Sequence, residues 1–133
     1  MASIETAVRD MLITGTTLST AGIPDTRVTH GYRLQDTVLP ACTFEVDRDE
    51  IITIGSNPLR TATVEVRIIA DTTNDALGFI TPLRNRCVPG TYDTLVFDAV
   101  IDRGHAIEGN TVGDGDESNP AELTYTFEIT YRG

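Results

Sequence analysis

The segment from Arg60 to Cys87 constrains the fold most, because a period of two passes directly into helical spacing there. Alternate positions of its first half are apolar, namely Ala62, Val64, Val66, Ile68 and Ala70. The positions between them are polar, with Ile69 as the one exception: Thr61, Thr63, Glu65 and Arg67. Strict alternation in β-branched residues predicts a strand with one buried face.

The second half of this segment predicts a helix that begins at Thr72. Thr72 and Asp75 have the spacing of a capping box, in which a hydroxyl precedes a carboxylate by three residues. Apolar residues then follow at helical spacing: Ala76, Ile80, Leu83 and Cys87. Pro82 removes a backbone donor, so the helix either kinks next to Gly78 or restarts at Thr81–Pro82. We expect this helix to pack on the strand before it.

The remaining elements extend this unit into one domain over residues 1–133. Ser3 caps a first predicted helix whose apolar stripe is Ile4, Ala7, Val8, Met11 and Leu12. Further strands are predicted at 26–34, 41–46, 95–102 and 121–132, and residues 103–119 are predicted to form a long exposed loop. Because strands and helices do not alternate, the expected class is α+β. Two helices would then cover one face of an antiparallel or mixed sheet with a long hairpin or loop insertion.

Charge limits the classes of partner. Twenty acidic residues against ten basic ones give a net charge of −10, and every basic residue is an arginine. Such a chain should not coat nucleic acid or an anionic membrane surface. The N-terminus has no signal-peptide pattern and the apolar runs are too short to span a membrane, so we expect a soluble protein. Cys42 and Cys87 then read as buried thiols rather than a disulfide.

Two acidic clusters are the strongest candidates for chemistry. Asp47, Asp49 and Glu50 could serve acid–base catalysis, but a solvated strand end explains them more simply. Asp114, Asp116 and Glu117 resemble a calcium loop without its ligand spacing, which favours a flexible acidic loop. His30 and His105 lack metal-ligand spacing, and no nucleophile elbow is present. We therefore expect no catalytic residues, no cofactor and no metal.

Assembly surfaces are a better candidate for function. The polar faces of strands 60–70 and 121–132 are rich in threonine, and either strand would offer unpaired backbone groups if it lay at a sheet edge. The 103–119 loop is long enough to act as a contact arm, although an idle surface loop remains the alternative.

The order of these elements resembles the tail completion or tail terminator proteins at the head–tail joint of long-tailed bacteriophages. The resemblance covers almost the whole chain. It rests on the N-terminal helix at 4–12, the strand entry at 38–44, the strand at 63–70 with its following helix, and the terminal strand at 123–131.

The resemblance implies a non-enzymatic ring, usually of six subunits. The ring would cap the tail tube protein, face the neck or connector protein of the head, and let DNA pass without specific binding. The protein would belong to the virion and be assembled in the host bacterial cytoplasm. Two alternatives stay open: a neck adaptor or stopper on the portal side, and a small metal-dependent enzyme that uses Asp47 or Asp49.

Charge balance suggests contact residues for such a ring. Arg60, Arg67, Arg84 and Arg86 are candidates for ion pairs between subunits with Asp47, Asp49 and Glu50. Asp114, Asp116 and Glu117 would lie on the contact arm.

Overall fold

The computed structural model describes residues 3–15, 17–31, 38–109 and 120–132. The elements in chain order are α1 (Ile4–Ile13), α2 (Thr17–Ala21), the 3-10 turn η1 (Asp25–Arg27), β1 (Val28–His30), β2 (Ala41–Ile51), β3 (Arg60–Ala70), α3 (Thr73–Leu77), α4 (Ile80–Arg86), β4 (Gly90–Tyr92), β5 (Leu95–Glu108) and β6 (Ala121–Arg132).

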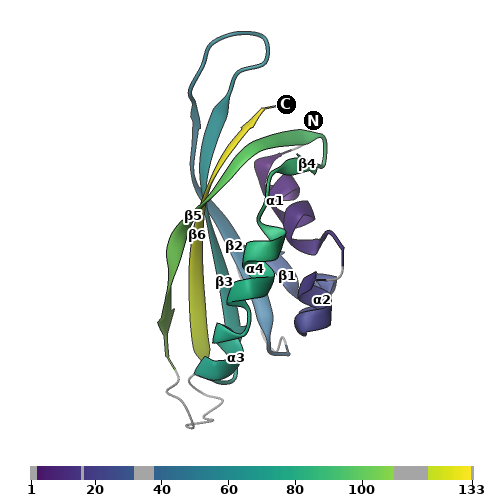
Figure 1. Ribbon diagram of the computed structural model, residues 1–133, viewed down its shortest axis with the longest axis vertical. Helices are drawn as coiled ribbons and strands as arrows, with labels where there is room; N and C mark the ends of the chain where they lie inside the picture. The colour runs from purple at the N-terminus through teal and green to yellow at the C-terminus, as the bar shows by residue number, and fades with distance from the viewer. Residues whose placement is uncertain (1–2, 16, 32–37, 110–119, 133) are drawn as a thin grey trace.

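The strands form one mixed sheet in the order β1-β2-β3-β6-β5-β4. The short β1 runs parallel to β2, and every other neighbouring pair is antiparallel. The four helices lie on one face of this sheet (Figure 1). The predicted α+β class with a mixed sheet is therefore confirmed, although the described residues form four α-helices rather than two.

The central strands β3 and β6 have the predicted alternation of buried residues. In β3, the alternate residues Ala62, Val64, Val66, Ile68 and Ala70 are all buried, and the positions between them are half-buried. In β6, the same alternation buries Leu123, Tyr125, Phe127, Ile129 and Tyr131. Fully burying a Val, Leu, Ile or Phe side chain contributes about 1.5–3 kcal/mol. The buried faces of these two central strands therefore form the surface against which the helices pack.

The α1 helix has its predicted cap and stripe. The Ser3 hydroxyl accepts a hydrogen bond from the Thr6 N–H at 3.1 Å, which satisfies one free donor of the first turn. All five predicted stripe residues are buried: Ile4, Ala7, Val8, Met11 and Leu12.

Of the two alternatives for the helical segment after β3, the structure shows a break and a restart. Thr72 caps α3 by accepting from the Asp75 N–H at 3.1 Å. The α3 helix ends at Leu77, and α4 begins at Ile80, one residue before the predicted restart. Pro82 is then the third residue of α4, where its missing N–H costs no helical hydrogen bond.

Two predicted boundaries were wrong because strands continue through bulges. The predicted 41–46 strand runs on to Ile51, with an irregularity between Val46 and Arg48. The predicted 95–102 strand runs on to Glu108, so residues 103–108 are strand rather than loop. Gly104 sits in the second β5 irregularity with a positive φ of 99°, a conformation that glycine adopts without strain. The rest of the predicted loop, residues 110–119, lies outside the described residues.

Within the predicted 26–34 strand, the described residues form the three-residue strand β1, and residues 32–34 lie outside the described residues. The threonine-rich stretch after Gly15 forms the short helix α2, which buries Leu18 in the core.

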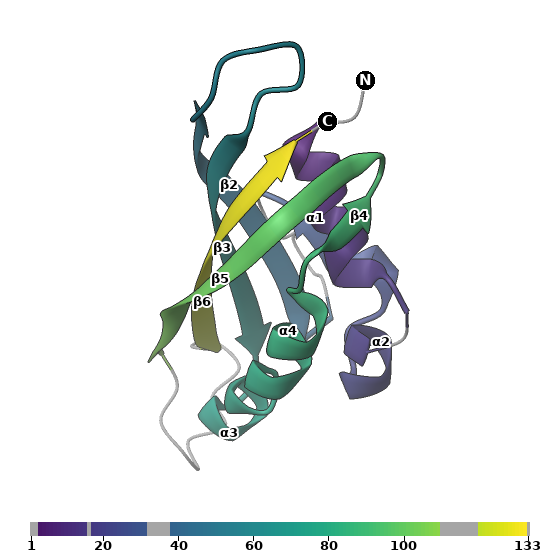
Figure 2. The ribbon, with the colours of Figure 1, turned by 45° about the horizontal axis from the view of Figure 1, so that its top comes forward.

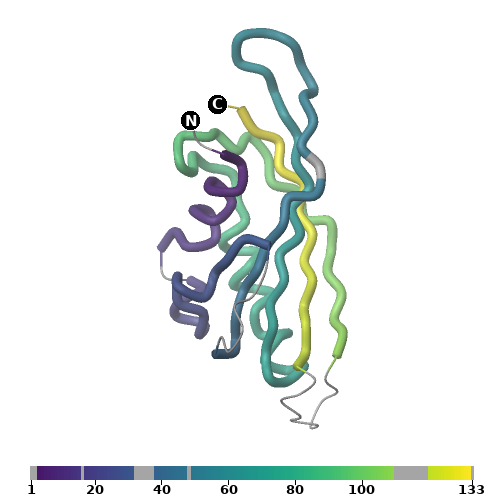
Figure 3. The backbone as a smooth tube through the Cα atoms, turned by 180° about the vertical axis from the view of Figure 1, so that it is seen from behind, coloured from purple at the N-terminus to yellow at the C-terminus, as the bar shows by residue number. Residues whose placement is uncertain are grey.

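The sheet is curled and extended at one end. In Figure 2, the start of β5 curves toward α1, so that β4 comes to lie near this helix. Seen from behind in Figure 3, the long strands run side by side, and the turn between β2 and β3 projects beyond the rest of the body. This turn and α3 lie at opposite ends of the long axis (Figure 1).

Candidate assembly interface

The suggestion that β3 or β6 could lie at a sheet edge was wrong, because both are central. The open edges lie elsewhere. β1 covers β2 only from Cys42 to Phe44, and β4 covers β5 only from Leu95 to Phe97. In the part of the chain that the structure describes, no strand pairs with the outer edges of β2 at 45–51 and of β5 at 98–108. Unpaired strand edges are ready-made sites for pairing with another chain.

The bulge in β2 changes which acidic residue faces the helices. Val46 lies opposite Val64 and Arg48 lies opposite Thr63, so Asp47 is the extra residue. The bulge turns Asp49 to the helix-covered face, opposite the buried Ala62. Without it, simple alternation would have placed Asp49 on the solvent face. Asp47 itself is exposed on the bulge, and Glu50 is exposed opposite Thr61 on the outer face.

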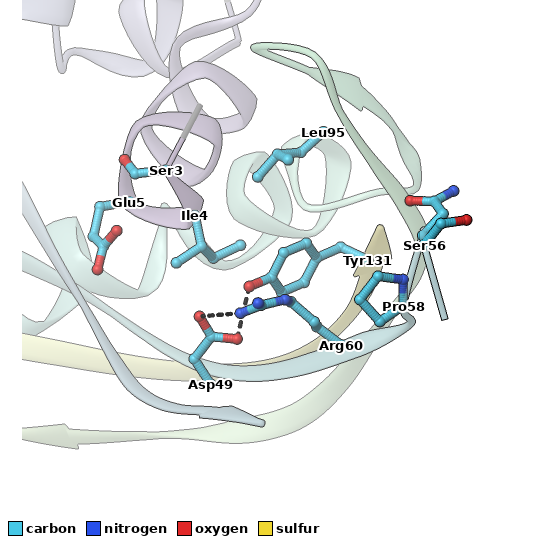
Figure 4. Close-up of a pocket in the computed structure, with 10 residues that line it drawn as sticks. Ser3, Ile4, Glu5, Asp49, Ser56, Pro58, Arg60, Leu95 and Tyr131 are labelled. Atoms are coloured by element: carbon cyan, nitrogen blue, oxygen red, sulfur yellow. Dashed lines mark hydrogen bonds and ion pairs between the residues drawn. The ribbon is translucent and has the colours of Figure 1, made fainter. Parts of the chain in front are cut away.

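Asp49, one of the three acidic residues predicted as contacts, interacts with Tyr131 and Arg60 of the same chain (Figure 4). The Tyr131 hydroxyl donates to Asp49 Oδ1 at 2.6 Å, and Arg60 Nη1 lies 3.8 Å from Asp49 Oδ2. Burial and the Asp49 carboxylate together raise the pKa of Tyr131 to about 12. The predicted pairing of Arg60 with an acidic residue of this cluster thus exists within one chain, and its role between subunits stays a prediction.

The same three residues line a hollow of about 420 Å³ at the base of the projecting turn. Its other walls are the start of α1, Leu95, and the turn residues Ser56, Asn57 and Pro58. The hollow holds two carboxylates, Asp49 and Glu5, and Asp49 is already engaged by a hydroxyl and a guanidinium. This arrangement fits a packing surface better than a reaction centre.

Arg67 lies on the outer, helix-free face of the sheet. Its guanidinium contacts Glu65 Oε1 at 2.5 Å and lies 3.6 Å from Glu122 Oε1. The hydrogen bond with Glu65 raises the pKa of Arg67 further above its ordinary value. On the same face, Arg103 pairs with Glu128 at 2.9 Å and Arg132 pairs with Asp98 at 2.8 Å. These three arginines are neutralised by carboxylates, so they add no attraction for phosphate.

Arg84 belongs to a cluster that ties α4 to the sheet. Its Nε donates to the Tyr125 hydroxyl at 2.6 Å and lies 3.4 Å from Asp102 Oδ2. The Tyr125 hydroxyl in turn donates to Asp102, and the His105 ring packs against the Tyr125 ring at 5.2 Å. Partial burial opposes ionisation of Asp102, but hydrogen bonds from Tyr125 and Gly104 and the Arg84 charge lower its pKa overall. Sequence reasoning did not connect these residues, because the β5 bulge that aligns Asp102 with Phe127 was not predicted.

The other predicted contact residues lie apart from these clusters. Arg86 donates from Nε to the Met11 carbonyl at 3.2 Å, which links α4 to α1. Asp114, Asp116 and Glu117 lie outside the described residues, so their predicted role as a contact arm stays a prediction.

Sequence reasoning missed the exposed isoleucines on the projecting turn. Ile51, Ile52 and Ile54 are 58%, 54% and 102% exposed. The signal was present in the sequence, since an apolar run lies in the nine-residue segment 51–59 that carries no charge. Exposed apolar side chains that gather in one place mark a contact surface.

The described residues contain no group of three or more His, Cys, Asp or Glu placed to hold a metal ion. Nor does any helix in the described ranges have the length and apolar character needed to cross a membrane. Cys42 and Cys87 are free thiols, both buried, and burial raises the pKa of Cys42 to about 12.

Comparison with known proteins gives a likeness of fold. No protein-family model matches the chain, and no curated protein matches it. Among solved structures, the chain is similar to a chain of the virion of a native gene transfer agent particle, with a TM-score of 0.69. That match has 10% sequence identity and covers 98% of this chain and 96% of the other. The protein therefore shares its fold, over nearly the full length of both chains, with a component of a virion.

Proposed function

We propose that this chain is a structural, non-enzymatic virion protein that forms a ring at the head-proximal end of a phage tail. The ring caps the tail tube, joins it to the head connector and lets DNA pass. The observation that carries the proposal is the near full-length likeness to a chain from a gene transfer agent virion. The resemblance of the sequence to tail terminator proteins narrows the role to this layer.

The sheet offers a route to a ring. Its two open edges, 45–51 of β2 and 98–108 of β5, lie on opposite sides and differ in sequence. Contacts between two different surfaces of the same chain run head to tail, and they close into a ring when the rotation between subunits permits. Successive neighbours in the order β2-β3-β6-β5 are antiparallel, so β2 and β5 run in opposite directions. Copies related by rotation about an axis along the strands would therefore pair β2 with β5 in antiparallel fashion.

Charge supports the passage of DNA. The chain carries a net charge of −10, and on the outer sheet face Arg67, Arg103 and Arg132 are each paired with a carboxylate. A channel wall with this character does not attract the polymer that must slide through it.

Mass photometry of the purified protein at several concentrations, with and without isolated tail tubes, tests the proposal. We expect a discrete closed oligomer and binding to tube ends. A strict monomer that never binds tube ends would refute the ring. Cross-linking in intact virions then distinguishes the terminator from a neck adaptor, because only a terminator cross-links to the tube protein.

A further inference from the structure

The turn between β2 and β3 is an ordered apolar projection. The Ile52 N–H donates to the Leu59 carbonyl at 2.7 Å, and the Leu59 N–H donates to the Thr53 hydroxyl at 2.7 Å. These bonds fix the two arms of the turn beyond the last strand pair, Ile51 with Arg60. Since the arms are already ordered, little conformational entropy is lost when the turn docks. The exposed Ile51, Ile52 and Ile54 are thus presented in advance of any contact.

Two apolar side chains are also exposed at the β4 end of the sheet. Val88 and Val96 are 37% and 39% exposed there, and residues 87–92 carry no charge. Val96 lies opposite Arg132 in the β5–β6 pairing, which places it on the outer face of the sheet. Ile51 faces the helix-covered side of the sheet, as Asp49 does. Ile52 is the next residue, so strand alternation places it on the outer face, the face that carries Val96.

The open edges bring these two surfaces together in neighbouring copies. β4 protects β5 up to Phe97, so the open edge of β5 starts at Asp98. If the open end of β2 pairs antiparallel with this edge, Ile51 of one copy lies near Asp98 of the next. The residues after Ile51 then run level with Phe97 and Val96 of the neighbour, at about 3.3 Å per residue, and meet β4, which occupies the edge of β5 there. The turn of one copy consequently reaches the β4 end of the other.

We infer that the β2–β3 turn (51–58) of one copy docks on the β4 end (88–97) of the next copy and covers Val88 and Val96. This inference rests on the proposed ring. A second copy is the occupant because the turn carries no charge, residues 88–97 carry only Asp93, and the adjoining Arg132 is paired with Asp98 at 2.8 Å. Copies that each carry a net charge of −10 repel one another, and they approach best through surfaces that add little to this repulsion. A basic partner would instead be drawn to the carboxylates elsewhere on the chain.

Disulfide trapping tests the contact directly. Ile52→Cys and Thr91→Cys chains are mixed and oxidised at a concentration where the wild type assembles, because Thr91 of β4 lies between the open edge and Val96. We expect a disulfide-linked pair in the mixture and, in the double variant, a ladder of products that ends at the ring. The native thiols do not interfere, because Cys42 and Cys87 are buried. Leu77→Cys is the matched control, since Leu77 is also exposed but lies on α3 at the opposite end of the molecule, and it should give no product with Ile52→Cys.

Association of serine variants gives the second measurement. The double variant Ile52→Ser, Ile54→Ser should raise the dissociation constant of assembly at least about tenfold, because two apolar side chains are lost from the contact. The control Leu77→Ser should leave this constant unchanged. Trapping only between two Ile52→Cys chains, or unchanged assembly of the serine variant, would overturn the docking while the ring survives. A wild-type chain that stays monomeric with and without tail tubes would overturn the ring as well.

Discussion

The hydroxyl of Tyr131, near the end of the last strand, donates to the Asp49 carboxylate across the helix-covered face of the sheet at 2.6 Å. The two residues are 82 positions apart in the chain. Their contact depends on the Asp47 bulge, which turns Asp49 inward, and it ties the base of the projecting turn to the centre of the sheet. This bond stabilises the end of the molecule at which we place the contact between copies.

Tyr131→Phe should lower the free energy of unfolding at pH 8 by about 1 kcal/mol, because a hydrogen bond to a partly exposed carboxylate is lost. The folded-state pKa of Tyr131 is raised to about 12 from the ordinary value of 10.0. Its contribution is therefore complete below pH 10 and is lost as pH rises through 12. Urea denaturation at pH 8 and pH 11 should show a smaller loss of stability with pH in the variant than in the wild type. Equal losses in both proteins would contradict this assignment.

The strands of the sheet centre could be predicted from the sequence because each alternates without interruption. β3 keeps one phase from Ala62 to Ala70, and β6 keeps one phase from Leu123 to Tyr131. The α1 helix could be predicted for the same reason, since Ser3 caps its start and its apolar residues keep helical spacing throughout. In these elements, local pattern and tertiary burial agree.

The full extents of β2 and β5, and the faces of their later residues, could not be predicted because bulges change their phase. In β5, Phe97 faces the core opposite Tyr131, but the following irregularity brings Val100, not Ala99 or Ile101, opposite Ile129. Ile101 is consequently exposed on the outer face. A bulge arises from the pairing of two distant segments, so the local sequence around Asp98 carries little trace of it. The same cause hid the inward position of Asp49 and the continuation of β2.

Leu83→Ala should destabilise the protein by about 2–5 kcal/mol, because it leaves a cavity between α4 and the sheet. Leu83 is fully buried, and it is the buried residue of α4, a helix of only seven residues. Leu77→Ala is the matched control on α3, where an exposed leucine should cost less than about 0.5 kcal/mol. Thermal unfolding followed by circular dichroism compares the two. Similar losses of Tm in both variants would show that α4 does not pack as described.

Thr61→Val should stabilise the isolated chain by about 1 kcal/mol. The Thr61 hydroxyl oxygen is buried, and among the described residues it is the one buried side-chain polar atom without a hydrogen-bond partner. Removing an unsatisfied buried hydroxyl while keeping the shape of the side chain recovers its desolvation cost, and valine also favours a strand. Chemical denaturation measures the gain. Thr63→Val, at the next outer-face position of β3, serves as the comparison, and a larger gain there would contradict the burial of Thr61.

Neither cysteine should react with a thiol reagent while the chain is folded. Reaction requires the thiolate, and burial raises the pKa of Cys42 to about 12 and raises the pKa of Cys87 above its ordinary value. At pH 8, a pKa of about 12 leaves only about one Cys42 thiol in ten thousand ionised, and burial also blocks the reagent. A colorimetric thiol assay should therefore count no thiols in buffer and two in concentrated guanidinium. Rapid reaction of one thiol in buffer would mean that the core around β2 and the end of α4 opens in the native state, and that disulfide trapping needs a cysteine-free background.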